Sequence, residues 1–141
     1  MKPDRSLLAG ETWQLLFELL EAGPRVPAVA AECGLTEAQC HVLRLLPPGR
    51  AVPMRALAER LGCDASNVTG IVDRLEARGL LSRRAAEHDR RVKELVLTAA
   101  GIQARQRVIE RLGEPPEPIA RLSPADQQTL CTILRKALGK A

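Results

Sequence analysis

The chain has 141 residues and a formal net charge of +4, from 21 Lys and Arg against 17 Asp and Glu. One Trp, one Phe and no Tyr argue against a single-stranded nucleic-acid binder that stacks bases on aromatic platforms. Two histidines exclude a His-rich metal centre. No apolar run approaches the roughly 18 residues of a membrane span, and the first residues lead us to expect no signal peptide. We therefore expect a cytoplasmic protein without a membrane partner.

The positive charge is concentrated in the middle of the chain. Residues 50–93 contain ten Lys and Arg against six Asp and Glu, and the remainder is neutral. A basic segment between neutral ends is typical of a phosphate-binding module flanked by packing elements. A solvated charged face is the alternative interpretation of the same pattern.

The hydrophobic pattern predicts helices joined by short links and one β-hairpin. We expect helices at about 5–22, 28–32, 36–46, 53–61, 64–78, 98–112 and from 123 onward, with strands at 80–84 and 91–97. This is a mainly α fold with a small β-hairpin wing, in the order of a winged helix-turn-helix. We divide it into an N-terminal helical dimerisation region (1–34), a DNA-binding domain (35–100) and a C-terminal helical dimerisation region (101–141).

Several residues mark where these elements begin and end. Thr36 and Gln39 have the spacing of a capping box. Gly62 is expected to form a left-handed turn, after which Asp64 caps the next helix. The Pro-rich segment 113–118 is expected to be a stiff link.

The helix at 64–78 has one apolar face and one face of small polar side chains. Its inward positions follow the helical period i, i+3, i+4, i+7, at Val68, Ile71, Val72 and Leu75. The outward face and its flanks carry Ser66, Asn67, Thr69, Gly70, Asp73, Arg74 and Ala77. A merely solvated helix usually carries Lys, Glu or Gln, and an internal Gly costs about 1 kcal/mol relative to Ala. Such a face suits a helix whose first turns enter the major groove of DNA.

The loop between the two strands is rich in charge. Arg90 and Arg91 at a hairpin tip can reach the narrow minor groove, where the negative potential is strongest. Asp89 is placed to brace one guanidinium. A charged solvent loop is the alternative.

The run from about Leu35 to Gly101 resembles the MarR family of bacterial transcriptional regulators. The matching fragments are Leu35–Gln39, Leu57–Leu61, Ser66–Leu80, Asp89–Arg91, and Leu97-Thr98 with Gly101. The resemblance implies a homodimer that binds a palindromic operator in double-stranded DNA, usually as a repressor.

Carried over by position, the resemblance also assigns roles to single residues. It implies that Ser66, Asn67, Thr69 and Gly70 lie in the major groove and that Arg74 contacts the DNA backbone. Asp89 and Arg91 match the family's Asp-x-Arg pair in the wing, with Arg90 beside it. A carboxylate next to DNA would be repelled, so we expect Asp73 to pair with an arginine of the chain.

The terminal helices carry apolar stripes that the central module does not need. In the last helix the stripe is Leu130, Ile133, Leu134, Ala137 and Leu138. Because exposed stripes promote aggregation, we expect the chain ends to meet each other and a second copy, giving a two-fold dimer. The alternative is that they close the core of the monomer.

Many members of the family bind phenolic or other anionic aromatic molecules between the dimer region and the DNA-binding lobe. The resemblance thus implies a small-molecule effector that releases DNA, with Trp13, Phe17, His41 and Arg44 as candidate pocket residues. Core packing is the alternative role for Trp13 and Phe17.

Other functions remain open. Regulation by oxidation or metal through Cys33, Cys40 and His41 is one alternative, although no CxxC pair is present and the helix after Thr98 lacks the histidines of zinc-sensing members. A winged-helix module that binds a protein instead of DNA is another. No Ser/His/Asp set, Gly-rich phosphate loop or carboxylate pair is visible, so we expect no enzyme activity and predict no cofactor or metal.

Overall fold

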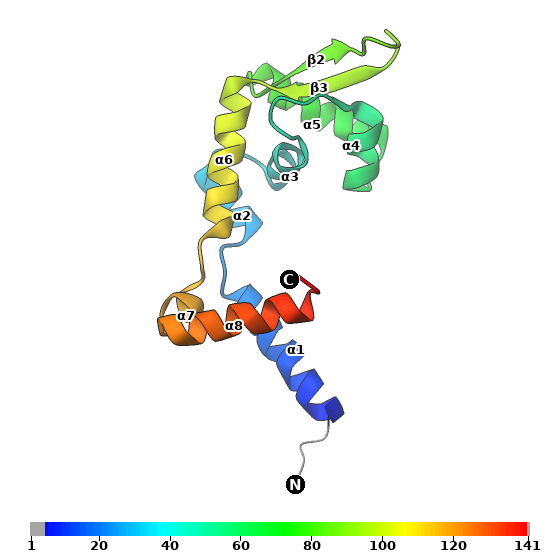
Figure 1. Ribbon diagram of the computed structural model, residues 1–141. Coiled ribbons are helices and arrows are strands. Elements are labelled where there is room, and N and C mark those ends of the chain that lie inside the picture. Colours follow the sequence, from blue (N-terminus) through cyan, green and yellow to red (C-terminus); the bar gives the residue numbers. More distant parts are fainter. Residues whose placement is uncertain (1–4, 141) are drawn as a thin grey trace. The chain divides into compact units, whose positions relative to one another are not determined.

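The computed structural model describes residues 5–140 and is mainly helical (Figure 1). The chain divides into two compact units, one formed by residues 25–113 and the other by the two ends of the chain, up to residue 24 and from residue 114. Among the described residues, no helix is both long and apolar enough to cross a membrane.

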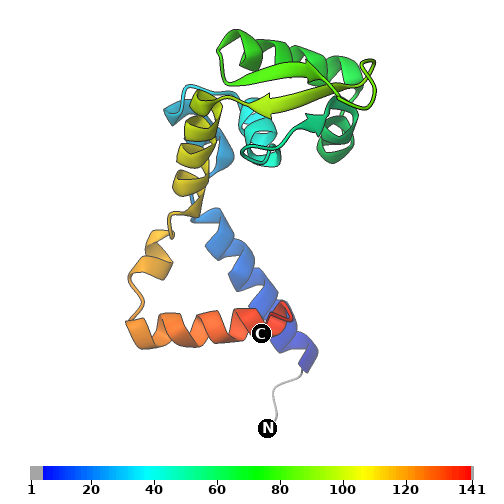
Figure 2. The ribbon, with the colours of Figure 1, turned by 45° about the horizontal axis from the view of Figure 1, so that its top comes forward.

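The unit 25–113 has the fold of a winged helix-turn-helix. Its elements are α2 (Val26–Glu32), α3 (Glu37–Leu45), β1 (Val52–Pro53), α4 (Met54–Leu61), α5 (Ala65–Ala77), β2 (Leu81–Ala85), β3 (Lys93–Leu97) and α6 (Ala99–Gly113). Helices α4 and α5 form the helix-turn-helix, and the β2–β3 hairpin packs along α5 (Figures 1 and 2). The predicted fold class is confirmed.

The sheet has three strands, one more than the sequence predicts. All pairs are antiparallel and the order is β1-β3-β2. The extra strand is β1, in which Val52 pairs with Leu95 and Pro53 with Glu94. Pro53 was expected to begin a helix, but it precedes α4 as its N-cap residue.

One hydrophobic core holds this unit together. Its largest fully buried side chains come from α2 to α6, the C-cap of α3 and both hairpin strands: Val29, Cys40, Val42, Leu43, Leu46, Leu57, Val68, Val72, Leu75, Leu81, Leu95 and Val108. Burying a Leu or Val side chain contributes roughly 1.5–3 kcal/mol relative to exposure. Both α2 and α6 pack against α3 in the same unit.

From the sequence, dimerisation was expected of residues 1–34 and 101–141, and DNA binding was expected of residues 35–100. This division of roles stays a prediction.

The boundary signals are largely confirmed. Thr36 Oγ1 accepts from the Gln39 N–H at 3.2 Å and Gln39 Oε1 accepts from the Thr36 N–H at 3.0 Å, which completes the capping box. Gly62 is left-handed with φ 61°. Asp64 is the N-cap residue of α5, but its side chain makes no capping hydrogen bond. Helix α2 begins at Val26, earlier than predicted, because Pro27 fits the first helical turn.

The second unit contains α1 (Arg5–Glu21), α7 (Glu117–Ala120) and α8 (Pro124–Ala137). The expected link at 113–118 is partly wrong, since Glu117 and Pro118 form the first turn of α7. Gln127 Nε2 ties α8 to this turn by donating to the carbonyls of Ile119 at 3.1 Å and Leu122 at 3.2 Å. Within this single chain the unit exposes large apolar side chains at Leu7, Leu8, Trp13, Leu15, Phe17, Leu20, Ile133 and Leu138.

Candidate nucleic-acid interface

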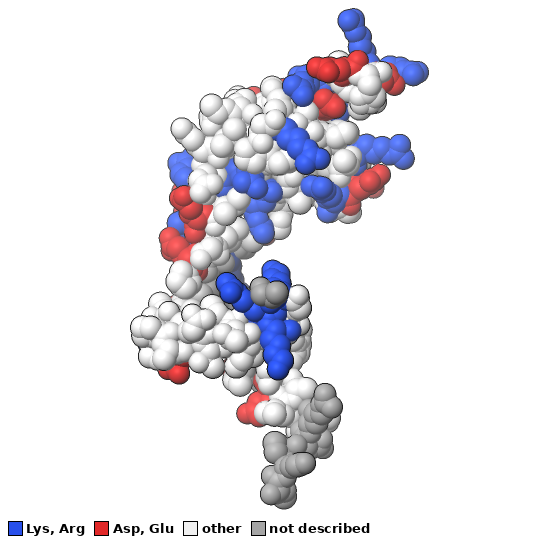
Figure 3. Space-filling view, in the orientation of Figure 1, with Lys and Arg blue, Asp and Glu red and all other residues white. Residues whose placement is uncertain are grey.

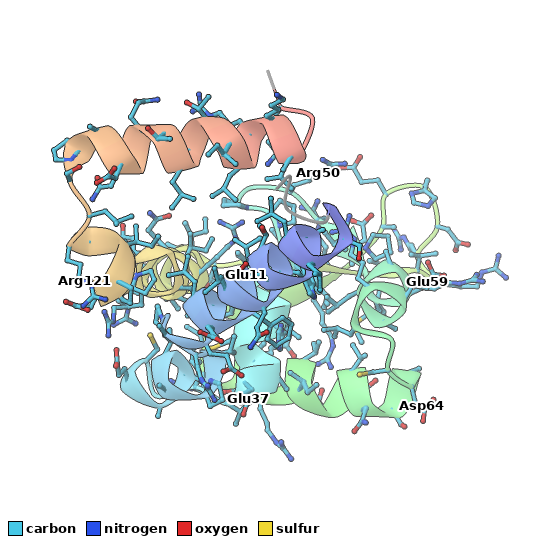
Figure 4. The ribbon with its side chains drawn as sticks, turned by 90° about the horizontal axis from the view of Figure 1, so that it is seen from below. Glu11, Glu37, Arg50, Glu59, Asp64 and Arg121 are labelled. Carbon is cyan, nitrogen blue, oxygen red and sulfur yellow. The ribbon has the colours of Figure 1, made fainter. Side chains whose placement is uncertain are left out.

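Helix α5 presents its predicted polar face outward. Val68, Val72 and Leu75 are fully buried, whereas the opposite side exposes Ser66, Asn67, Thr69 and Arg74, with Gly70 half-buried. Figure 4 shows Asp64 at the N-terminal end of this helix. The polar residues that were expected to share a face of this helix therefore do lie on one accessible face of α5.

Gly70 leaves room on this face, and Thr69 leaves hydrogen-bonding capacity on it. A Cβ added at Gly70 would meet nothing within 4 Å, so no neighbour enforces glycine there. Thr69 Oγ1 donates to the Ala65 carbonyl at 2.8 Å, which leaves its lone pairs free to accept. A small residue beside open space suits the close approach of another surface.

The wing tip is ordered by Asp89. The Arg91 backbone N–H donates to Asp89 Oδ1 at 3.0 Å, and Arg91 Nε donates to the same oxygen at 3.2 Å. The backbone hydrogen bond and then the guanidinium lower the pKa of Asp89. The expected bracing is confirmed, while the Arg91 side chain remains 91% exposed. Arg90 beside it is also exposed.

Asp73 pairs with an arginine, as expected, and the partner is Arg83 on β2. Arg83 Nη2 donates to Asp73 Oδ1. Arg83 Nη1 also donates to Glu76 Oε1 at 2.8 Å, and the Arg83 backbone N–H donates to Glu76 Oε2 at 2.9 Å. Sequence reasoning missed Arg83 and Glu76. The i, i+3 spacing of Asp73 and Glu76 was the available signal for a shared partner.

Basic side chains surround these elements. Lys and Arg project from the wing end of the unit 25–113, with acidic side chains beside them (Figure 3). The basic middle of the sequence therefore lies on the same unit as the polar face of α5, an arrangement suited to phosphate contacts.

The candidate effector residues fall on both units. His41 and Arg44 line a groove of about 640 Å³ with Ala38, Leu45, Arg60, Leu61, Cys63 and Ile71. These residues come from α3, α4, the turn after α4, and α5. Trp13 and Phe17 lie on α1 with their ring centroids 6.2 Å apart in an edge-to-face contact. Their shared role in an effector site stays a prediction.

The cysteines differ in accessibility. Cys40 is buried, and burial is the main cause that raises the pKa of its thiol, with neighbouring Cys33 adding to the effect. Cys33 is half-buried, and Cys63 and Cys131 are exposed. Across residues 5–140, no group of three or more His, Cys, Asp or Glu side chains is placed to hold a metal ion.

Comparison with known proteins identifies the relatives of this chain. Residues 35–93 match the model of the MarR family. The chain is 30% identical over 107 residues to the HTH-type transcriptional regulator MhqR of Bacillus subtilis, covering 75% of this chain and 73% of MhqR. It is 35% identical over 88 residues to the HTH-type transcriptional repressor MdtR of the same organism, covering 62% of this chain and 56% of MdtR.

The fold extends over the whole length of a solved relative. The X-ray crystal structure of the Bacillus subtilis YusO protein superposes with a TM-score of 0.74 at 27% identity, covering 98% of this chain and 99% of YusO. Against curated relatives the match is shorter, since the chain spans 56% of the length of both MdtR and the regulator YfiV. Sequence, winged helix-turn-helix fold and relatives agree, and the chain belongs to the MarR family of transcriptional regulators.

Proposed function

We propose that this protein is a sequence-specific DNA-binding repressor that acts as a homodimer on a palindromic operator. The observation that carries the proposal is the exposed polar face of α5 beside a wing whose Arg91 is braced by Asp89. The name of MdtR, a transcriptional repressor, supports the direction of control.

The geometry suggests how each part contacts DNA. The first turns of α5 would enter the major groove, where Asn67 can read adenine and Ser66 or Thr69 can contact base edges or phosphates. Arg74 would bind the DNA backbone, while Arg90 and Arg91 would enter the minor groove. A two-fold dimer presents two such units, which is why a palindromic site fits.

The test is fluorescence anisotropy with a duplex that the wild-type protein selects from a random-sequence library. We expect binding to be tighter than to a scrambled duplex by at least about 10³ and to weaken steeply as salt rises. Asn67→Ala should lose about 1–3 kcal/mol of discrimination at one base position. Arg107→Gln, an exposed change on α6, is the control. Weak, sequence-blind binding by the wild type would instead favour a protein-interaction module.

A small anionic aromatic effector is proposed to release the DNA. The groove at His41 and Arg44 supports this role, because Arg44 and Arg60 face it together with apolar Leu45, Leu61 and Ile71. Its volume lies within the range of small-molecule pockets. Benzoate and 2-naphthoate are suitable probes, and Arg44→Gln should weaken their binding. Quenching of Trp13, the single tryptophan, would instead place the ligand at Trp13 and Phe17.

A further inference from the structure

We propose that Arg83 is a positioning residue that locks the recognition helix α5 to the wing and thereby sets the spacing between the two DNA-reading elements. The role presupposes DNA binding and so rests on the proposed function. No direct contact between Arg83 and DNA is required.

The contacts of Arg83 run from one reading element to the other. Arg83 lies on β2, the strand that leads into the wing, whereas Asp73 and Glu76 lie on α5. Its guanidinium bridges both carboxylates, and its backbone N–H donates to Glu76. The Arg83 side chain is only 25% exposed. One residue thus ties strand and helix through main chain and side chain together.

This arrangement is specific to arginine and to this strand position. A planar guanidinium can donate to two carboxylates at once, which a lysine ammonium matches poorly. The next residue, Arg84, pairs instead with Glu94 of the neighbouring strand at 3.5 Å. Both arginines carry the same charge on the same strand. The ion pairs of Arg83 are with α5, whereas the ion pair of Arg84 is with β3. Arg84 is therefore a matched control.

If Asp73 and Glu76 position Arg83, one double variant should bind DNA more weakly. If they are only surface charges, the same variant should bind DNA more tightly. Asp73 and Glu76 side chains are 58% and 39% exposed on a helix proposed to face DNA phosphates. If they act only as surface charges, Asp73→Asn with Glu76→Gln removes repulsion and strengthens binding to every duplex. If they hold Arg83, the same variant loosens the helix–wing spacing and weakens binding to the selected duplex.

The first experiment measures affinity for the library-selected duplex and for its scrambled version. We expect the Asp73→Asn/Glu76→Gln variant to lose about tenfold in affinity for the selected duplex, with no loss for the scrambled one. Arg83→Lys should keep the scrambled affinity and lose part of the preference, whereas Arg84→Gln should keep the preference. Equal gains on both duplexes, or full preference in Arg83→Lys, would overturn the proposal.

The second experiment needs no DNA. Amide hydrogen exchange of the free protein should be faster in the wing and the C-terminal half of α5 for Arg83→Gln than for Arg84→Gln. Exchange unchanged from the wild type in Arg83→Gln contradicts the lock. If the proposed function is wrong but the lock exists, the wild-type protein selects no duplex. The difference in amide exchange between Arg83→Gln and Arg84→Gln then persists.

Discussion

Gly101 has the least room among the glycines of the chain. It lies in the first turn of α6, where a Cβ would stand 1.7 Å from the carbonyl oxygen of Leu80. Because the obstacle is backbone that also accepts the Thr98 N–H at 3.2 Å, it cannot move aside cheaply. Thr98 Oγ1 accepts from the Gly101 N–H at 3.0 Å and donates to the Gly79 carbonyl at 2.5 Å, so the start of α6 is held against the turn that follows α5.

We expect Gly101→Ala to lower the free energy of unfolding by about 2–3 kcal/mol, or to prevent folding. Urea denaturation, monitored by circular dichroism, measures this change in the free energy of unfolding. Gly70→Ala is the matched comparison, since its Cβ meets open space. That change should stabilise the protein by about 0.5–1 kcal/mol and weaken operator binding, because a methyl group would enter the DNA-facing surface. Equal stability losses at both positions would contradict the packing at Leu80.

Asp89 gives the wing a defined pH dependence. Its pKa is lowered from 3.8, first by the Arg91 backbone N–H and then by the Arg91 side chain. A carboxyl group with a lowered folded-state pKa is stabilising above its unfolded pKa, and the contribution is lost as pH falls through the folded-state value. The Asp89–Arg91 pair should therefore stay intact from neutral pH down to about pH 4.

Carbon-detected NMR titration of the Asp89 carboxyl group tests this. We expect a midpoint below that of an unfolded-peptide aspartate, and only a partial rise in Arg91→Gln because the backbone donor remains. A midpoint at or above the peptide value would show that the wing tip is open in solution.

Among the helices, α3 and α5 have different kinds of N-terminus. Thr36 completes a reciprocal capping box for α3, whereas Asp64 precedes α5 without a side-chain capping bond. Thr36→Ala should cost about 1 kcal/mol of stability, since it leaves the Gln39 N–H without its acceptor. Asp64→Ala should cost only a few tenths of a kcal/mol, from the helix dipole. Thermal unfolding of the two variants compares them, and equal costs would refute the difference.

The helices and helix ends that could be predicted from the sequence depend on local signals. Helical periods and the signals at Thr36 and Gly62 depend on a few neighbouring residues, and the structure confirms them. Strand β1 escaped prediction because two residues become a strand only by pairing with β3, which lies about forty residues later. Arg83 escaped for the same reason, since its partners face it only once the hairpin packs along α5.

At the scale of the whole molecule, α1 exposes apolar side chains on more than one face. Leu8 and Leu15 are seven residues apart, and Trp13, Phe17 and Leu20 follow a second i, i+4, i+7 line. Single apolar residues on a surface are ordinary, but a helix lined this way is typical of an interface. Ile133 on α8 and Leu138, the C-cap residue of that helix, are exposed apolar side chains of the same unit.

A second copy of the chain is the binding partner that would cover these apolar side chains and would also suit a palindromic operator. We expect the wild type to sediment as a dimer and Leu20→Glu, at a side chain 73% exposed in the single chain, to shift it toward monomer. Gln128→Glu on α8 introduces the same charge at an exposed polar position and should remain dimeric.

The monomeric variant should also bind the selected duplex more weakly by about 10²–10⁴, because the two half-sites are no longer held by one assembly. Its salt slope should fall by about half, since each bound molecule displaces counterions from one half-site. Leu20 lies outside the unit 25–113, so the contacts of α5 and the wing are unchanged by the substitution. A wild type that sediments as a monomer and still binds the full site tightly would separate DNA binding from dimerisation, and would leave the apolar faces of α1 to a different partner.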